Sequence, residues 1–386
     1  MEQSVVLSAV RTPLGRRGKG LSTVHPTRLL GQVQRAALDA AGIDPAEVGQ
    51  VIGGCVAQVG EQAFNLTRTA WLAEGLPESV GASTVDAQCG SSQQALTVAA
   101  ALVGAGLVDL ALACGVESMS RIPIGANFRK EHKLGRPVPK EYFEHYEFLN
   151  QYQAAERIAE KWGVSREQAD ELGLRSQQLA AAAWAEGRFD GQIVPITAPV
   201  PESEDDQVVA RDEGLRETSL DKLAALDPVV PGGIHTAGTA SQVSDGASAV
   251  LVASERLAAR RNLTPLARIV DTATVGVDPV MMLLGPHDVT PMLLGRNKLG
   301  IDDLDLIEIN EAFASVVLSW AKDTRPDPER VNPNGGAIAL GHPLGGTGCV
   351  LTTKAVHELR RSGGRYGLVT MCCGGGLGTG TLLERL

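Results

Sequence analysis

Three glycine-rich segments of this chain each carry a side chain that could do chemistry. Cys89 lies directly before Gly90, His342 lies directly before Pro343, and Cys372 lies shortly before a run of three glycines. Glycine allows backbone N–H groups to approach a ligand closely, and a thiol beside an imidazole can be activated as a nucleophile. Three such turns in one chain indicate covalent acyl chemistry.

Each candidate side chain also has an ordinary structural interpretation. Cys89 precedes a predicted helix, whose N-terminal partial positive charge would stabilise a thiolate, but a free cysteine is more often a small buried apolar residue. His342 taken alone fits a structural loop histidine, because the following proline disfavours helix and fixes the backbone. Cys372 runs into Gly374, whose N–H group could face an oxyanion or belong to a simple chain reversal. Asn310 ends a predicted strand, where it could cap the next helix or hold a water against a carbonyl oxygen.

Composition limits the class of protein. The chain has 386 residues, enough for two or three domains, of which 44% are hydrophobic and 21% charged. The formal net charge of −10 argues against a nucleic-acid partner. The first ten residues lack the pattern of a signal peptide, and no apolar run approaches the ~20 residues that span a membrane. The six cysteines are dispersed except for Cys372 and Cys373, which predicts free thiols and a cytoplasmic location.

Sequence motifs for other common sites are missing. No cysteine and histidine pair has the spacing of a zinc site, so we expect no metal. We find no P-loop, no dinucleotide-binding glycine fingerprint on a strand and no nucleophile elbow around a serine. The chemistry therefore has to come from the thiols and the imidazole themselves.

Predicted strands and helices alternate along the first 117 residues. We expect strands at 5–10, 48–56, 83–87 and 108–114, and helices at 26–41, 65–74 and 91–105. The last of these helices is apolar on most faces and should be buried. This alternation predicts an α/β fold with a parallel sheet covered by helices on both sides.

The second half repeats the plan of the first. The tripeptide Gly-Ile-Asp precedes a predicted strand both at residue 42 and at residue 300. The turns of Cys89 and His342 each open a predicted helix that is followed by an apolar strand. We therefore predict a duplicated unit that brings Cys89 and His342 to related turns. The alternative is that any two strand–helix–strand units look alike.

Residues 118–235 differ in character from both halves. They are rich in charged residues, contain predicted helices near 150–162 and 166–186 and a proline-rich acidic stretch at 195–207, and should form an inserted cap over one half. Residues 236–262 return to small residues of helix–strand character and should complete the first half. The predicted domains are 1–117 completed by 236–262, the inserted loop domain 118–235, and 263–386.

Together, the segments around Cys89, Asn310, His342 and Cys372 resemble the thiolase family, and the similarity runs from Arg11 to the end of the chain. The resemblance implies a duplicated five-layer αβαβα fold with an inserted loop domain that helps to bind coenzyme A. It implies an acyltransferase that uses CoA to cleave a 3-ketoacyl-CoA into acetyl-CoA and a shortened acyl-CoA in fatty-acid or sterol side-chain β-oxidation. CoA is then a substrate, no cofactor is permanently bound, and a homodimer or homotetramer is expected.

The family's roles carry over to particular residues. The resemblance implies that Cys89 is the acylated nucleophile, that His342 is its base, and that Cys372 moves the proton at the substrate's α-carbon. Cys372 is chosen over its neighbour because the family pattern is Met-Cys-x-Gly-Gly-Gly. One oxyanion site would comprise His342 and Asn310, and Asn310 would act through a water. The other oxyanion site would comprise the backbone N–H groups of Cys89 and Gly374. Contacts to CoA or to the acyl chain are expected from Arg216, Ala237, Ser241, Met282 and Phe313.

The chain departs from the thiolase pattern at two places, and other protein classes fit its four segments less well. Ser92 stands where the nucleophile turn often has glycine, which should matter little. The His-Met pair of acetoacetyl-specific members is absent, which favours degradative thiolysis over the alternative, acetoacetyl-CoA synthesis. A decarboxylating condensing enzyme would lack the second cysteine, and a non-catalytic acyl-CoA binder would not keep all four segments. A redox pair of Cys372 and Cys373 would be strained.

Overall fold

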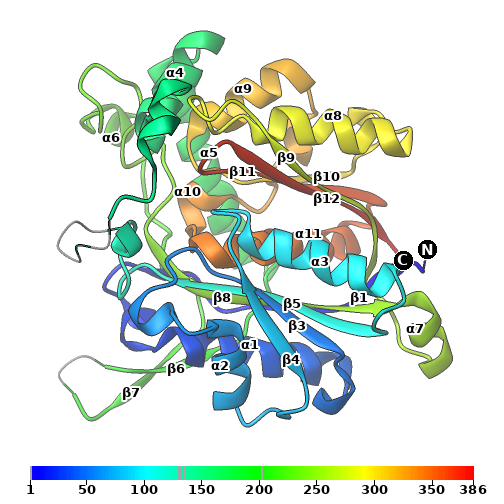
Figure 1. Cartoon of the computed structure of the whole chain (residues 1–386). Helices are drawn as coiled ribbons and strands as arrows, with labels where there is room; N and C mark the ends of the chain where they lie inside the picture. Colours follow the sequence, from blue (N-terminus) through cyan, green and yellow to red (C-terminus); the bar gives the residue numbers. More distant parts are fainter. Residues whose placement is uncertain (1, 129–132, 134, 201–202) are drawn as a thin grey trace.

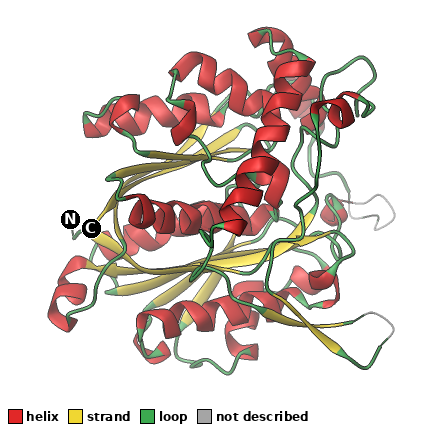
Figure 2. Ribbon diagram, turned by 180° about the vertical axis from the view of Figure 1, so that it is seen from behind, coloured by secondary structure: helices red, strands yellow, loops and turns green. Residues whose placement is uncertain are grey.

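The computed structural model describes residues 2–128, 133, 135–200 and 203–386. Helices and sheet are stacked in five layers, with two sheets separated by a central pair of helices and covered outside by further helices (Figures 1 and 2). None of the helices in these ranges is long and apolar enough to cross a membrane.

The first half forms one sheet with helices on both faces. Its elements are β1 (Ser4–Arg11), β2 (Gly15–Arg16), α1 (Pro26–Ala41), β3 (Gln50–Gly54), α2 (Leu66–Ala73), β4 (Gly81–Val85), α3 (Ser91–Gly104), β5 (Leu110–Ser118), β8 (Ser244–Ser254) and α7 (Glu255–Arg261). The strand order is β4-β3-β5-β8-β1. Helices α1 and α2 cover one face, and α3 covers the other.

The second half has the same construction. Its elements are β9 (Ala267–Gly276), α8 (Gly285–Asn297), β10 (Leu306–Ile309), α9 (Ala314–Thr324), α10 (Ala337–Leu340), α11 (Thr347–Ser362), β11 (Tyr366–Cys373) and β12 (Leu377–Arg385). The strand order is β10-β11-β12-β9, and α11 lies on the inner face while α8 lies on the outer face.

Strand order and direction identify the duplication. In the first half, β3 pairs parallel with β5, β5 antiparallel with β8, and β8 antiparallel with β1. In the second half, β10, β11, β12 and β9 pair in the same order with the same three directions. The two sheets join where β1 pairs with β9 over three residues. The sheet is therefore mixed, whereas the sequence predicted a parallel one, because β8 returns from the insertion and enters antiparallel between β5 and β1.

The two central helices bring the two halves together. Helix α3 packs on strands of both sheets, as does α11, and the two helices contact each other. Their starts are joined directly, since the backbone N–H of Cys349 donates to Ser92 Oγ at 3.0 Å. Ser92 thus accepts a hydrogen bond from an N–H group at a helix start that the helix itself cannot satisfy. Cys89 and His342 lie just before α3 and α11, so this contact holds their two turns close together.

Local chemistry explains the helix boundaries that the sequence predicted best. Helix α1 begins at Pro26, whose missing N–H is no loss in a first turn, and ends before Gly42, which has a left-handed φ of 63°. Leu29, Leu30 and Val33 lie on its buried face. The predicted range 26–41 is confirmed.

The inserted segment contacts both halves, whereas the sequence suggested a cap over one. Its elements are α4 (Gln151–Trp162), α5 (Arg166–Ala185), β6 (Ile196–Pro199), β7 (Asp206–Val209) and α6 (Leu220–Ala224). Helices α4 and α5 pack on the second half, while β6 lies against residues 20–23 of the first. A buried ion pair between Arg11 Nη1 and Asp212 Oδ1 (2.7 Å) ties the segment to β1. The domain boundaries themselves remain our proposal.

One expected element does not form. Residues 236–243 were predicted to have helix–strand character, but they form turns, in which Thr236 N donates to Thr239 Oγ1 at 2.8 Å, before β8 begins at Ser244. Threonine side chains that bond nearby backbone groups favour such turns over helix. The turn places Ala240 beside Phe313 in an isolated bridge.

Candidate active site

Cys89 lies in a sharp turn between β4 and α3. Gln88 has a left-handed φ of 53°, which residues other than glycine rarely adopt. Ser91 holds the turn, since its hydroxyl donates to Gln88 O (2.5 Å) and accepts from Ala87 N (3.0 Å). The turn directs the backbone N–H of Cys89 at its own sulfur.

The sulfur of Cys89 is buried and faces two N–H groups. Burial raises the pKa of this thiol to about 11, and the negative charges of Glu117 and Asp86 add to the rise. Hydrogen bonds from the backbone N–H groups of Gly374 and Cys89 act in the opposite direction but are outweighed. Burial outweighs the influences that favour a thiolate, so the resting group at pH 7 is a thiol. The two N–H groups are placed to stabilise negative charge that develops beside the sulfur.

His342 is held in one orientation and one tautomer. Gly341 has a φ of 123°, and a Cβ there would lie 2.4 Å from Ser244 Oγ, so glycine is required. Ser244 Oγ accepts the backbone N–H of His342 at 3.1 Å. The Thr347 hydroxyl donates its hydrogen to Pro343 O (2.8 Å), so it accepts from His342 Nδ1 (2.6 Å). The lone pair is then on Nε2, where a base needs it.

Asn310 faces the other ring nitrogen of His342. Its amide Nδ2 lies 3.4 Å from His342 Nε2, and an amide nitrogen can only donate, which agrees with the tautomer set by Thr347. Asn310 does not cap the following helix, because α9 begins at Ala314 with Phe313 as its N-cap residue. Burial lowers the pKa of His342 to about 4, so the imidazole is neutral at pH 7.

Cys372 and Cys373 have different surroundings, as expected for neighbours on a strand. Cys372 is fully buried in an apolar cluster with Phe313 and Met282. Cys373 packs in the cluster between the sheets, where its sulfur lies against the Cys89–α3 turn. Burial raises the pKa of both Cys372 and Cys373, and the charge of a Cys89 thiolate would raise the pKa of either thiol further, so both sulfurs lie near that of Cys89.

Packing of the surrounding backbone brings the four segments together. The backbone N–H of Asn310 donates to Thr370 O at 3.0 Å, which sets the end of β10 beside the strand that carries Cys372. A Cβ on Gly54 would lie 2.3 Å from Ser92 N and 2.8 Å from Gly345 O, so the segments after Cys89 and after His342 meet over this glycine. The structure thus gathers Cys89, Asn310, His342 and Cys372 at one end of the two sheets.

The residues expected to contact CoA or the acyl chain form two groups. Phe313 and Met282 share the cluster of Cys372, and Ser241 N donates to Ala312 O (2.9 Å) beside it. Arg216 and Ala237 form the second group, in which Arg216 Nη2 donates to Ala237 O at 3.2 Å. Their roles in binding stay predictions.

Two family models together match nearly the whole chain, and related proteins match its full length. The model described as thiolase, N-terminal domain, matches residues 4–256, and that described as thiolase, C-terminal domain, matches residues 263–385. The chain belongs to the thiolase family. A steroid 3-ketoacyl-CoA thiolase of Mycobacterium tuberculosis is 47% identical over 100% of this chain and 95% of its own length. A beta-ketoadipyl-CoA thiolase of Acinetobacter baylyi is 41% identical, with full coverage of both chains.

Solved thiolase structures share the fold. An acetyl-CoA acetyltransferase of Bacillus anthracis has a TM-score of 0.92 and 37% identity, and the human mitochondrial 3-ketoacyl-CoA thiolase has 0.90 and 36%; each match covers 100% of this chain and 99% of the other. Membership of the thiolase family makes the chain an acyltransferase with a duplicated αβαβα fold.

Sequence reasoning missed two residues that hold this thiolase site in place. Thr347 fixes the His342 ring, and its position one helical turn after Pro343 was the available signal. Glu117 is fully buried and accepts the N–H groups of Val56 (2.9 Å) and Gly345 (2.9 Å), so it connects β5 to the loop after His342. No spacing in the sequence could have revealed that connection, because its partners are 61 and 228 residues away.

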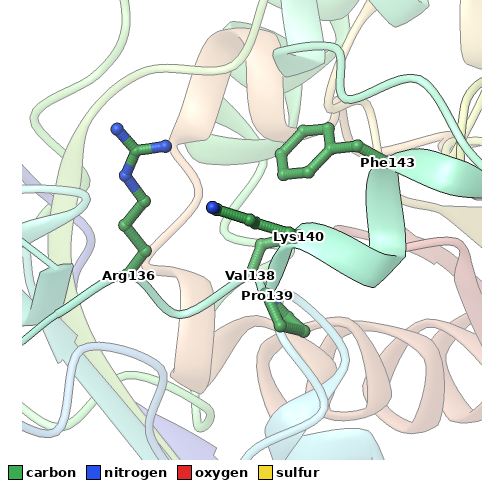
Figure 3. Close-up of a pocket in the computed structure, with 5 residues that line it drawn as sticks. All are labelled: Arg136, Val138, Pro139, Lys140 and Phe143. Atoms are coloured by element: carbon green, nitrogen blue, oxygen red, sulfur yellow. The ribbon is translucent and has the colours of Figure 1, made fainter.

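A separate cavity lies in the inserted segment of this thiolase. It has a volume of about 490 Å³ and is lined by Arg136, Val138, Pro139, Lys140 and Phe143 (Figure 3). None of these residues was predicted to act in the chemistry. The cavity therefore contributes nothing to the assignment of the catalytic group.

Proposed function

We propose that this thiolase cleaves 3-ketoacyl-CoA esters in the degradative direction through an acyl-enzyme on Cys89. The observation that carries the proposal is that the segments after Cys89 and after His342 meet over Gly54, with Asn310 Nδ2 3.4 Å from His342 Nε2 and the N–H group of Gly374 beside the Cys89 sulfur. A carbonyl carbon bound to this sulfur would have its oxygen beside two preorganised donors, each worth roughly 3–4 kcal/mol of transition-state stabilisation.

In the first half-reaction, His342 Nε2 accepts the proton of the Cys89 thiol while the sulfur attacks the 3-keto carbon. The bond between the α-carbon and this carbon then breaks, and the shortened acyl group stays on Cys89. The electron pair of that bond leaves as the enolate of acetyl-CoA, and Cys372 donates the proton that completes acetyl-CoA. In the second half-reaction, the Cys372 thiolate accepts the proton of the CoA thiol as the CoA sulfur attacks the thioester, and His342 returns its proton to the departing Cys89 sulfur, so that both thiols and the neutral imidazole are restored.

A second carbonyl oxygen needs its own stabilisation, because the enolate carries negative charge on the CoA thioester. Asn310 and His342 form the group proposed for this role. Among the described residues, the buried Oδ1 of Asn310 has no hydrogen-bond partner, which leaves it able to orient a water. The Nδ2 group of Asn310 faces His342 at 3.4 Å and keeps the two side chains together.

Arg216 is proposed to contact the nucleotide end of CoA, with Ala237 beside it. Its guanidinium is half-buried, and both burial and the charge of Arg16 lower its pKa. Two cations held near each other attract a phosphate group. Ser241, Met282 and Phe313 are proposed to line the path of the pantetheine and acyl chain, since they border the cluster that contains Cys372.

The names of the relatives support the degradative direction, since those of Mycobacterium tuberculosis and Acinetobacter baylyi are named as thiolases of steroid 3-ketoacyl-CoA and of beta-ketoadipyl-CoA, both larger than acetoacetyl-CoA. The similarity to an acetyl-CoA acetyltransferase keeps acetoacetyl-CoA synthesis as the second candidate. The proposed pathway is β-oxidation of fatty acids or sterol side chains. A cytoplasmic dimer or tetramer stays a prediction.

A panel of 3-ketoacyl-CoA substrates of increasing size tests this function. With CoA present, the wild-type chain should consume substrates larger than acetoacetyl-CoA faster than acetoacetyl-CoA itself. Cys89→Ser should abolish consumption, whereas the control Cys114→Ser, in the middle of β5, should retain it. Turnover restricted to acetoacetyl-CoA would favour the second candidate, and full activity of Cys89→Ser would refute the mechanism.

A further inference from the structure

Two side-chain amides border the glycine whose N–H group faces the nucleophile. Gln88 directly precedes Cys89, and Gln151 is the first residue of α4 in the inserted segment. A Cβ on Gly374 would lie 3.3 Å from Gln88 Oε1 and 3.6 Å from Gln151 Nε2. Two chain segments that are far apart in sequence thus place amides on the same side of Gly374.

Neither amide is engaged by the rest of the protein. The side chains of Gln88 and Gln151 form no hydrogen bond with any residue in the described part of the chain. Both side chains are half-buried. Other glutamines near the site are occupied; for example, Gln93 Nε2 donates to Val369 O at 3.1 Å. Because both side chains are only partly buried, water can satisfy these amides until a ligand displaces it. These two amides are therefore available to a bound molecule.

An acyl group on Cys89 would extend past these amides. The N–H groups of Gly374 and Cys89 fix where the thioester oxygen lies, so the acyl carbon has to lie beside Gly374. The amides border that glycine, so an acyl chain that leaves the thioester on their side would meet them within a few bonds. The neighbouring wall is aromatic, since the ring of Tyr152 packs edge-on against Phe313 with centroids 4.9 Å apart, and the Tyr152 hydroxyl adds a polar group to it. An oxygen on the acyl chain would thus find polar partners at Gln88 and Gln151, with the Tyr152 hydroxyl as a further one.

The charge around Cys89 favours a neutral oxygen over a carboxylate. Asp86 and Glu117 are the charged groups that act on the Cys89 sulfur, and both are acidic. Amides are neutral and cannot compensate a second negative charge in a buried site, where an unpaired carboxylate is expensive. A ketone or hydroxyl carries no such penalty and can use an amide as donor or acceptor.

We propose that Gln88 and Gln151 select 3-ketoacyl-CoA substrates whose acyl chain carries a second, uncharged oxygen, a ketone or a hydroxyl, close to the carbonyl that Cys89 attacks. This inference rests on the proposed thiolase function and specifies its substrate class. Gln88 and Gln151 are then specificity residues that contact the substrate and take no part in proton transfer.

Three substrates of similar length test this selection. At the far end of the acyl chain, 3,6-dioxoheptanoyl-CoA carries a ketone, 3-oxoheptanoyl-CoA carries no oxygen, and 3-oxoadipyl-CoA carries a carboxylate. The wild-type chain should have a kcat/KM for the dioxo substrate about tenfold above that for each of the others, as one or two good hydrogen bonds provide. Gln151→Met and Gln88→Met, which keep side-chain length but remove the amide, should each lower the dioxo-to-plain ratio several-fold. The control Gln178→Met, on the exposed face of α5, should leave the ratio unchanged.

The ratio between substrates keeps the test valid if a variant loses stability, because a structural defect lowers both rates together. A wild-type ratio near one, or a ratio that neither variant changes, would overturn the inference while thiolysis of 3-oxoheptanoyl-CoA upheld the proposed function. A preference for 3-oxoadipyl-CoA would overturn the selection of an uncharged oxygen. Failure to cleave any of the three would refute the proposed function, and the inference with it.

Discussion

Replacing Thr347 with valine should disable His342 without touching a reacting atom. Valine keeps the shape of threonine but removes the hydroxyl that accepts from His342 Nδ1 at 2.6 Å. The ring is buried, so its Nδ1–H group would lose its partner at a cost of about 1–3 kcal/mol. Moving the proton to Nε2 relieves that cost, but it directs N–H at the Asn310 amide nitrogen and removes the lone pair that the base needs.

The expected magnitude follows from that cost. If the competent tautomer loses about 2 kcal/mol, its ratio to the other tautomer falls about 30-fold, and kcat should fall by up to that factor. KM should change little, because Thr347 does not touch substrate in the proposed mechanism. Thr347→Ser restores the hydroxyl and should recover most of the activity.

The assay is steady-state thiolysis of a 3-ketoacyl-CoA, with thermal melting as a check on folding. Thr352→Val is the matched control, since Thr352 is also buried in α11 and also donates to the carbonyl four residues earlier, Gly348 O at 2.8 Å, but has no histidine partner. Equal losses in Thr347→Val and Thr352→Val, or a serine variant no better than valine, would refute the reasoning.

Three further predictions concern the same site. The pKa of His342 is about 4 when folded against an ordinary value of 6.5, so the unfolded chain alone binds this proton between those values. His342 should therefore contribute at most about 3 kcal/mol to the fall in the free energy of unfolding from pH 6.5 to pH 4. In His342→Gln, which removes this proton site, the fall measured by denaturant titration should be smaller by that contribution. Alkylation of Cys89 by iodoacetamide, followed by mass spectrometry, should accelerate about tenfold per pH unit above pH 7, because the pKa of the thiol is about 11; a plateau below pH 8 would instead show a preformed thiolate. Cys372→Ala should cripple turnover yet allow acyl transfer to Cys89, while Cys373→Ala should have a mild effect on rate; equal losses would mean that the two cysteines are misassigned.

Much of the site was accessible from sequence because its chemistry is concentrated in short segments. Cys89, His342 and Cys372 stand in glycine-rich turns, and the structure brings those turns together at one end of the sheets. The limits of α1 were predicted because proline and glycine act locally.

What the sequence did not reveal depends on contacts between distant residues. The sequence offered no partner for Arg11, yet it is buried against Asp212, 201 residues away, and its guanidinium lies 5.0 Å from the ring centre of Phe189. The pKa of Cys89 was expected to fall through the helix N-terminus, but burial, which no local pattern reports, raises it. Gln88 and Gln151 are 63 positions apart in the sequence, and only the fold places both amides beside Gly374.

The central claim is that an acyl group is carried on Cys89 in a site shared with Cys372. The most direct measurement is mass spectrometry of the protein after mixing with a 3-ketoacyl-CoA in the absence of free CoA. The account predicts one shortened acyl group per chain, on the peptide containing Cys89, with release of an equal amount of acetyl-CoA. An acyl group on Cys372, Cys373 or another residue, or acetyl-CoA release without acylation, would contradict it.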